Sequence, residues 1–171
     1  MNDYISSCRR QIEQNGFALV FPRGVSMRPL IWGGQHSVAV IPLDGEPRRG
    51  ELIVFTMMRE NGEAGIVHRL VDVRMNENGE SVYVMRGDNN LVCEYINGSQ
   101  IIGRVSEVHR LGGIRPWYII PQRKFTVRDR SYCVYSKVWS LSWPLRRMIY
   151  LLRAHTYGLI ARIRKSPAGR S

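Results

Sequence analysis

One serine, one histidine and one aspartate have the types and surroundings needed for nucleophilic chemistry on a carbonyl. Ser26 follows an apolar stretch and precedes Met27 and Pro29, His68 lies in an alternating segment, and Asp88 lies in a turn. A serine hydroxyl is a weak nucleophile, so it needs a base within hydrogen-bond reach and a group that fixes the tautomer of that base. Imidazole suits the base because its pKa lies near the working pH. We expect Ser26 to attack, His68 to take the proton and Asp88 to orient His68.

Short strands at regular spacing must position these side chains. A polar segment at 3–14 predicts a short helix that ends at Asn15 and Gly16. Asn-Gly pairs at 78–79 and 97–98 mark turns, because both residue types tolerate positive φ. The strands are expected at 17–21, 38–41, 51–55, 65–73, 81–85, a short segment ending at 97, and 101–109. Many short strands with little helix predict a mainly β domain.

The positive charge lies at the end of the chain. The 171 residues carry a net charge of +11, yet residues 1–122 hold equal numbers of basic and acidic side chains. Residues 123–171 hold 12 basic side chains and one acid, Asp129. Apolar residues recur there at helical steps, at Val138, Leu141, Leu145, Met148, Leu152, Leu159 and Ile163. The sequence therefore predicts a β domain at 1–115 and a basic, amphipathic, mostly helical tail at 116–171.

A basic tail implies an anionic partner. Arginines and aromatic residues beside an apolar stripe favour an anionic membrane surface, contacted through residues 117–165. Packing of the stripe on the β domain or on another subunit is the second hypothesis. Nucleic acid or an acidic protein is the third; nucleic acid is disfavoured, because the 25 residues before Ser26 are too few for a helix-turn-helix domain.

No signal peptide and no clear transmembrane segment is recognisable, since no apolar stretch reaches the roughly 18 residues that span a bilayer. We expect a location in the cytoplasm or at the inner face of the membrane. The three cysteines, Cys8, Cys93 and Cys133, have neither metal-ligand spacing nor a disulfide pattern. No metal or other cofactor is expected.

Five blocks in order resemble the signal peptidase I and LexA-like serine peptidase superfamily. They lie at 24–29, 49–55, 67–71, 86–90 and 101–105. A histidine in place of lysine resembles the branch found in archaea and the endoplasmic reticulum, and all three lysines of this chain lie in the tail. The resemblance implies an open or barrel-like β-sheet whose edge receives an extended peptide. It also implies cleavage after small residues.

The resemblance also implies roles for four neighbouring residues. Gly24 stands where the family often has a serine that helps the oxyanion hole, so the hole would rest on backbone N–H groups, including that of Ser26. Met27 and Pro29 belong to the nucleophile motif, where proline fixes the backbone. Glu94 stands where the histidine branch has a second acid, so a supporting role is expected.

These observations predict a serine endopeptidase that removes a signal or leader peptide from a precursor protein or peptide by a Ser–His–Asp mechanism. The alternative is a non-catalytic module that holds an extended peptide at its sheet edge while the tail docks it to a membrane or partner. The reactivity of Ser26 separates the two, because a binding module has no reason to activate it.

Overall fold

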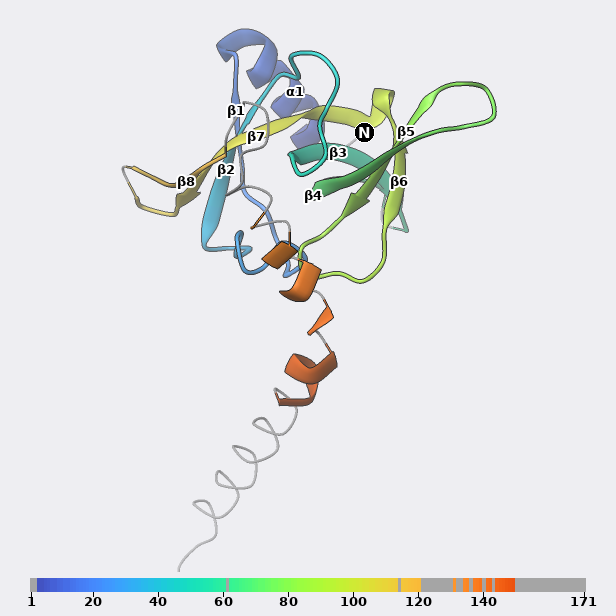
Figure 1. Cartoon of the computed structure of the whole chain (residues 1–171). Helices are drawn as coiled ribbons and strands as arrows, with labels where there is room; N and C mark the ends of the chain where they lie inside the picture. The colour runs from blue at the N-terminus through green and yellow to red at the C-terminus, as the bar shows by residue number, and fades with distance from the viewer. Residues whose placement is uncertain are drawn as a thin grey trace, which may run out of the picture.

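The chain folds around one strongly curled antiparallel sheet (Figure 1). The computed structural model describes residues 3–60, 62–113 and 115–120, and then residues 131, 134–135, 137–139, 141–142 and 144–149. Helix α1 (Asp3–Asn15) packs beside the first strand. The strands are β1 (Ala18–Val20), β2 (His36–Ile41), β3 (Leu52–Arg59), β4 (Gly62–Met75), β5 (Ser81–Arg86), β6 (Glu94–Asn97), β7 (Ile101–Arg110) and β8 (Pro116–Ile119).

The strand order is β1-β2-β7-β3-β4-β5-β6, and β8 pairs with β7. The mainly β class is thereby confirmed. The helix predicted at 3–14 forms within one residue of its expected ends. Strand β8 is not among the predicted elements, and because it pairs with β7 the sheet extends past the boundary expected at residue 115.

Strand β3 is buried on both faces, which explains its unbroken apolar sequence. Leu52 and Val54 belong to a cluster with the β1, β2 and β7 side of the sheet, whereas Ile53 and Phe55 belong to a cluster with β5 and β6. Successive side chains of a strand point to opposite faces, so this one strand joins two cores.

Strand β4 has a free edge along its first half. Its residues 62–69 pair with β3, and residues 69–75 pair with β5. Among the described strands, residues 62–68 therefore pair with β3 alone, and every second one turns its N–H and C=O toward the other edge. His68 is the last residue of this unpaired stretch.

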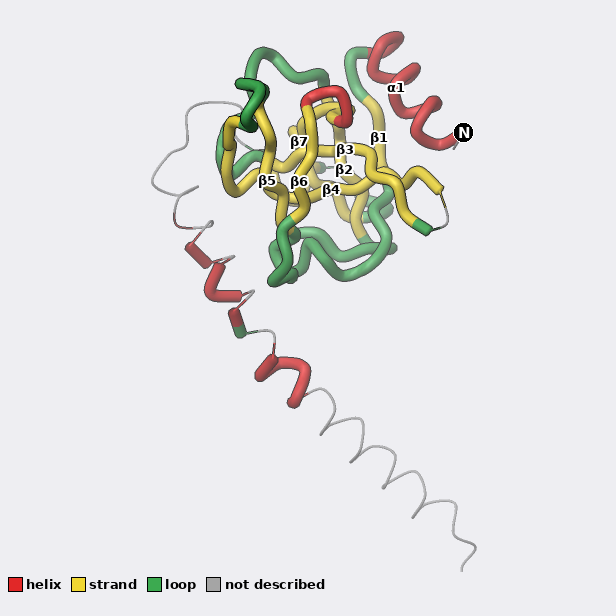
Figure 2. Tube along the Cα trace, turned by 90° about the vertical axis from the view of Figure 1, so that its right-hand side faces the viewer, coloured by secondary structure: helices red, strands yellow, loops and turns green. Residues whose placement is uncertain are grey.

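The described residues between 131 and 149 are mostly helical and lie at the end of the sheet opposite α1 (Figures 1 and 2). The Ser142 N–H donates to the Val138 carbonyl, and the Arg146 N–H donates to the Ser142 carbonyl, each at 3.0 Å, as in an α-helix. In the part of the chain that the structure describes, no helix has the length and apolar character to cross a membrane. The rest of the predicted tail lies outside the described residues.

Candidate active site

Ser26 lies in the long connection between β1 and β2, which is fastened at several points. The Asn89 N–H donates to the Ser26 carbonyl at 2.7 Å, and the Asn89 side-chain amide donates to the Val25 carbonyl at 3.1 Å. Met27 is buried in the core next to the serine. The carbonyl of Pro29 accepts a hydrogen bond from the Trp32 indole at 2.8 Å. The backbone around Ser26 is therefore held by the core on one side and by residue 89 on the other.

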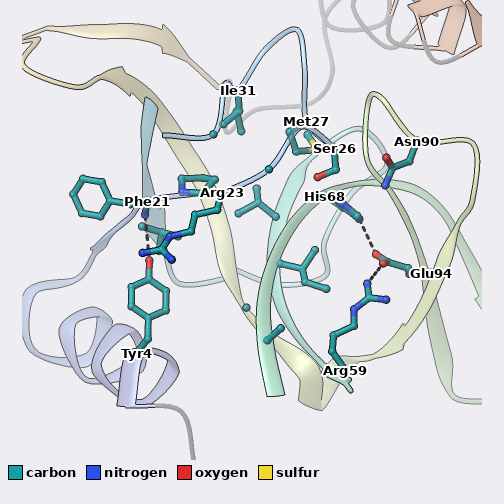
Figure 3. A pocket seen from close by; sticks show the side chains of 18 residues that line it. Tyr4, Phe21, Arg23, Ser26, Met27, Ile31, Arg59, His68, Asn90 and Glu94 are labelled. Carbon is teal, nitrogen blue, oxygen red and sulfur yellow. Dashed lines mark hydrogen bonds and ion pairs between the residues drawn. The ribbon is translucent and has the colours of Figure 1, made fainter. Parts of the chain in front are cut away.

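Ser26 and His68 lie side by side in the same cavity (Figure 3). Gly87 lies closely against both of them: a Cβ built on residue 87 would lie 3.0 Å from His68 Nε2, 3.0 Å from Ser26 Cβ and 2.7 Å from the Ser26 carbonyl oxygen. Only glycine leaves this space open. The sequence prediction that Ser26 and His68 meet in space is supported by this geometry.

Glu94, at the start of β6, holds the other nitrogen of the imidazole. Its Oε2 lies 2.7 Å from His68 Nδ1, and its Oε1 accepts a hydrogen bond from Arg59 at the end of β3 (Figure 3). Burial raises the pKa of the Glu94 carboxyl, but the hydrogen bonds and charges of His68 and Arg59 together lower it by more, so the pKa lies below its ordinary value. An ionised Glu94 accepts a hydrogen bond from the Nδ1–H group and leaves the lone pair on Nε2, the nitrogen that lies against Gly87 as Ser26 does.

Asp88 does not make the contact that the sequence predicted for it. Its Oδ1 and Oδ2 accept hydrogen bonds from Arg69 Nε and Nη2 at 2.8 and 2.9 Å, and its side chain is fully buried. The carboxylate at His68 Nδ1 is that of Glu94, for which only a supporting role was expected. Asp88 ties the 87–90 loop to β4, a structural contribution rather than an orienting one.

Strand alternation explains the exchange of roles. His68 and Arg69 are consecutive in β4, so their side chains point to opposite faces of the sheet. Glu94 pairs with Met85, whose side chain lies in the same core cluster as Leu70, two residues from His68. Glu94 thus stands on the His68 face, whereas Asp88 meets Arg69 on the other.

The cavity forms a groove of about 870 Å³ between two extended segments. Residues 64–68 at the free edge of β4 form one wall, and residues 20–24, from the last residue of β1 onward, form the other. Tyr4 of α1 lies at one end, where its hydroxyl accepts a hydrogen bond from the Phe21 N–H at 3.1 Å. Ser26, His68 and Glu94 lie along the same groove, so an extended chain laid against β4 would pass the serine hydroxyl.

Gly24 and the Ser26 N–H meet the requirements of a backbone oxyanion site in part. Gly24 has φ +88°, a conformation that L side chains rarely adopt, and it lines the groove. Among the described residues the Ser26 N–H donates no hydrogen bond, so it is available to a developing oxyanion.

Sequence reasoning missed three contributors: Arg59, Gly87 and Asn89. Gly87 and Asn89 flank Asp88 in the 86–90 block, and the match of this block to the family motif was the sequence feature that could have revealed them. Arg59 had no local signal, because its partner is 35 residues away.

Burial raises the pKa of the Cys8 thiol, which disfavours Cys8 as a second nucleophile. No cluster of metal-ligating side chains occurs within the described residues.

Comparisons with models of known protein families and with curated proteins found no match to this chain.

Proposed function

We propose that this chain is a serine endopeptidase of the signal peptidase I and LexA-like type, which removes a signal or leader peptide from a precursor. The observation that carries the proposal is the groove along the free edge of β4, in which Ser26 and His68 lie next to each other and Glu94 holds His68. A binding groove alone has no need of a carboxylate that fixes a histidine tautomer beside a serine.

The proposed chemistry follows the positions of the protons. Ser26 Oγ attacks the scissile carbonyl carbon, and its proton passes to His68 Nε2. The new oxyanion is stabilised by the Ser26 N–H, and the imidazolium by Glu94. His68 Nε2 then protonates the leaving amine as the C–N bond breaks. Water deprotonated by His68 hydrolyses the acyl-enzyme and regenerates Ser26.

The substrate would bind as an added strand. Main-chain groups on the free edge of β4 supply hydrogen bonds to an extended peptide, and alternate side chains of that peptide enter the groove. Next to Ser26 the groove is lined by Met27 and Ile31, which suits small apolar side chains.

The second candidate is a non-catalytic peptide-binding module. In the described part of the chain no hydrogen bond joins the Ser26 hydroxyl to His68. Catalytic hydrogen bonds often tighten only when substrate binds, so this observation fits both candidates.

The experiment is mass spectrometry of the protein incubated with a library of peptides rich in small residues. Wild type, Ser26→Ala, His68→Ala and Glu94→Gln are compared at equal concentration. We expect cleavage by wild type, none by the first two variants and much slower cleavage by the third. Equal peptide binding by all four with no cleavage by any would favour the binding module.

The tail is proposed to dock to an anionic membrane surface at its inner face. Val138, Leu141, Leu145 and Met148 are each more than half exposed, so these residues of the apolar stripe do not pack on the β domain. An exposed apolar stripe with surrounding arginines fits the interface of a bilayer.

Co-sedimentation of the full chain with vesicles tests this docking. Binding to vesicles with phosphatidylserine and weaker binding to neutral vesicles is expected. Leu141→Glu with Leu145→Glu should abolish binding, whereas the matched pair Ser81→Glu with Tyr95→Glu in the β domain should not. Equal sedimentation of wild type and both double variants with phosphatidylserine vesicles would contradict the proposal.

A further inference from the structure

Arg146 links the C-terminal segment to the loop that holds the nucleophile. Its Nη2 donates to the side-chain oxygen of Asn89 at 2.7 Å. Asn89 is buried, and it donates to the carbonyls of both Val25 and Ser26. Hydrogen bonds therefore link Arg146 to Asn89, and Asn89 to the backbone of Ser26.

The guanidinium of Arg146 is itself held in place. It lies over the Trp139 ring at 3.9 Å, its Nη2 also donates to the Trp139 carbonyl at 2.8 Å, and its Nε donates to Ser142 Oγ at 2.9 Å. Ser142 Oγ donates in turn to the Trp139 carbonyl at 2.7 Å. The planar guanidinium of arginine can stack on the Trp139 ring and donate to the Trp139 carbonyl, the Ser142 hydroxyl and Asn89 at the same time, which the single ammonium of lysine cannot do.

The arrangement uses the two faces of the segment differently. Trp139, Ser142 and Arg146 recur at steps of three and four and are half-buried, and Arg146 contacts the β domain through Asn89, whereas the apolar residues at 138, 141, 145 and 148 are exposed. The half-buried face of the segment is therefore the one that is hydrogen-bonded, through Asn89, to the backbone of Val25 and Ser26.

We propose that Arg146 is a positioning residue of the active site, which fixes Asn89 and through it the backbone of Ser26. This inference rests on the proposed peptidase function. Without Arg146 the side-chain oxygen of Asn89 loses its donor, and the 87–90 loop loses one of its attachments, of which the Asp88–Arg69 pair is another. The serine then departs from its position beside His68, and misplacement by about 1 Å costs on the order of a hundredfold in rate.

The first measurement is amide hydrogen exchange by NMR, which needs no substrate. The Asn89 N–H is the donor to the Ser26 carbonyl, so its exchange reports that bond directly. We expect Arg146→Ala to speed Asn89 exchange at least about tenfold, and Arg147→Ala, which removes the same charge one position along, to leave it within about twofold. Equal exchange in wild type and Arg146→Ala overturns the proposal whether or not the protein cleaves peptides.

The second measurement is kcat and KM on a peptide that wild type cleaves. Arg146→Ala should lower kcat about tenfold to a hundredfold with KM within about threefold, because the groove walls are untouched. Arg146→Lys should recover part of kcat, since its ammonium can still donate to Asn89. Faster Asn89 exchange with unchanged kcat would confine Arg146 to a structural role and overturn the positioning claim. A wild type that cleaves nothing refutes the proposed function separately.

Discussion

Replacement of Glu94 by glutamine is the sharpest test of the site, because the two oxygens of this carboxylate serve different partners. Oε1 accepts from Arg59 and Oε2 faces His68 Nδ1. An amide has one acceptor oxygen, and Arg59, which can only donate, requires it. The NH2 group of the introduced glutamine must then face Nδ1, where it donates. The proton of the neutral imidazole moves to Nε2, so His68 can no longer accept the serine proton.

The expected loss has two parts. A hydrogen bond to a charged group contributes about 1.5–3 kcal/mol, which alone corresponds to a kcat loss of about ten- to 150-fold. The wrong tautomer adds to it: the corresponding aspartate-to-asparagine change in a well-studied serine protease costs about 10⁴ in kcat. We expect Glu94→Gln to lose between about 10² and 10⁴ in kcat.

The assay is steady-state cleavage of a fluorogenic peptide, with urea unfolding as the check on folding. Glu80→Gln, the same change at an exposed turn, is the matched control and should behave as wild type. The double variant with Arg59→Met should recover part of kcat, because the freed amide can rotate its oxygen toward Nδ1. A Glu94→Gln enzyme within about threefold of wild type, or a double variant slower still, would refute the assignment of Glu94.

Other contacts of the site and of the fold lead to three more predictions. Gly87→Ala should lower kcat about a hundredfold, because the added Cβ would lie 3.0 Å from the imidazole Nε2 of the base and from the Cβ of the nucleophile, whereas an equally active variant would show that the site has room. Asp88→Ala should lower the free energy of unfolding by about 3–5 kcal/mol, because it removes the ion pair and the two hydrogen bonds that Asp88 makes with the buried guanidinium of Arg69; urea titration checks this, and a loss below about 1 kcal/mol would contradict it. The pKa of Glu94 is lowered on folding, so its stabilisation is fully present above the unfolded value of about 4.3 and is lost as the pH falls through the folded pKa. The stability difference between wild type and Glu94→Gln should shrink in acid, and a difference that grows on acidification would count against the assigned contacts.

Local patterns in the sequence were sufficient for α1, for strands β1 to β7 and for two residues of the candidate site, but not for β8. The alternating segment around His68 forms β4, and the apolar run 51–55 forms the doubly buried β3. Period-two alternation and turn residues act over a few positions, so they are visible without a fold. Ser26 and His68 were found because their surroundings match a known order of motifs.

The choice of carboxylate was decided only by the tertiary structure. Asp88 lies in the connection between β5 and β6, and Glu94, six residues further on, begins β6; nothing local distinguishes the partner of His68. The register of β4, β5 and β6 places Glu94 on the His68 face and leaves Asp88 to Arg69 on the opposite face. A shift of one residue in that register would exchange the faces, and register depends on long-range strand pairing. The contact between Arg146 and Asn89 joins positions 57 residues apart. The sequence by itself therefore determined which side chains could do chemistry, and the packing of distant segments decided which of them meet.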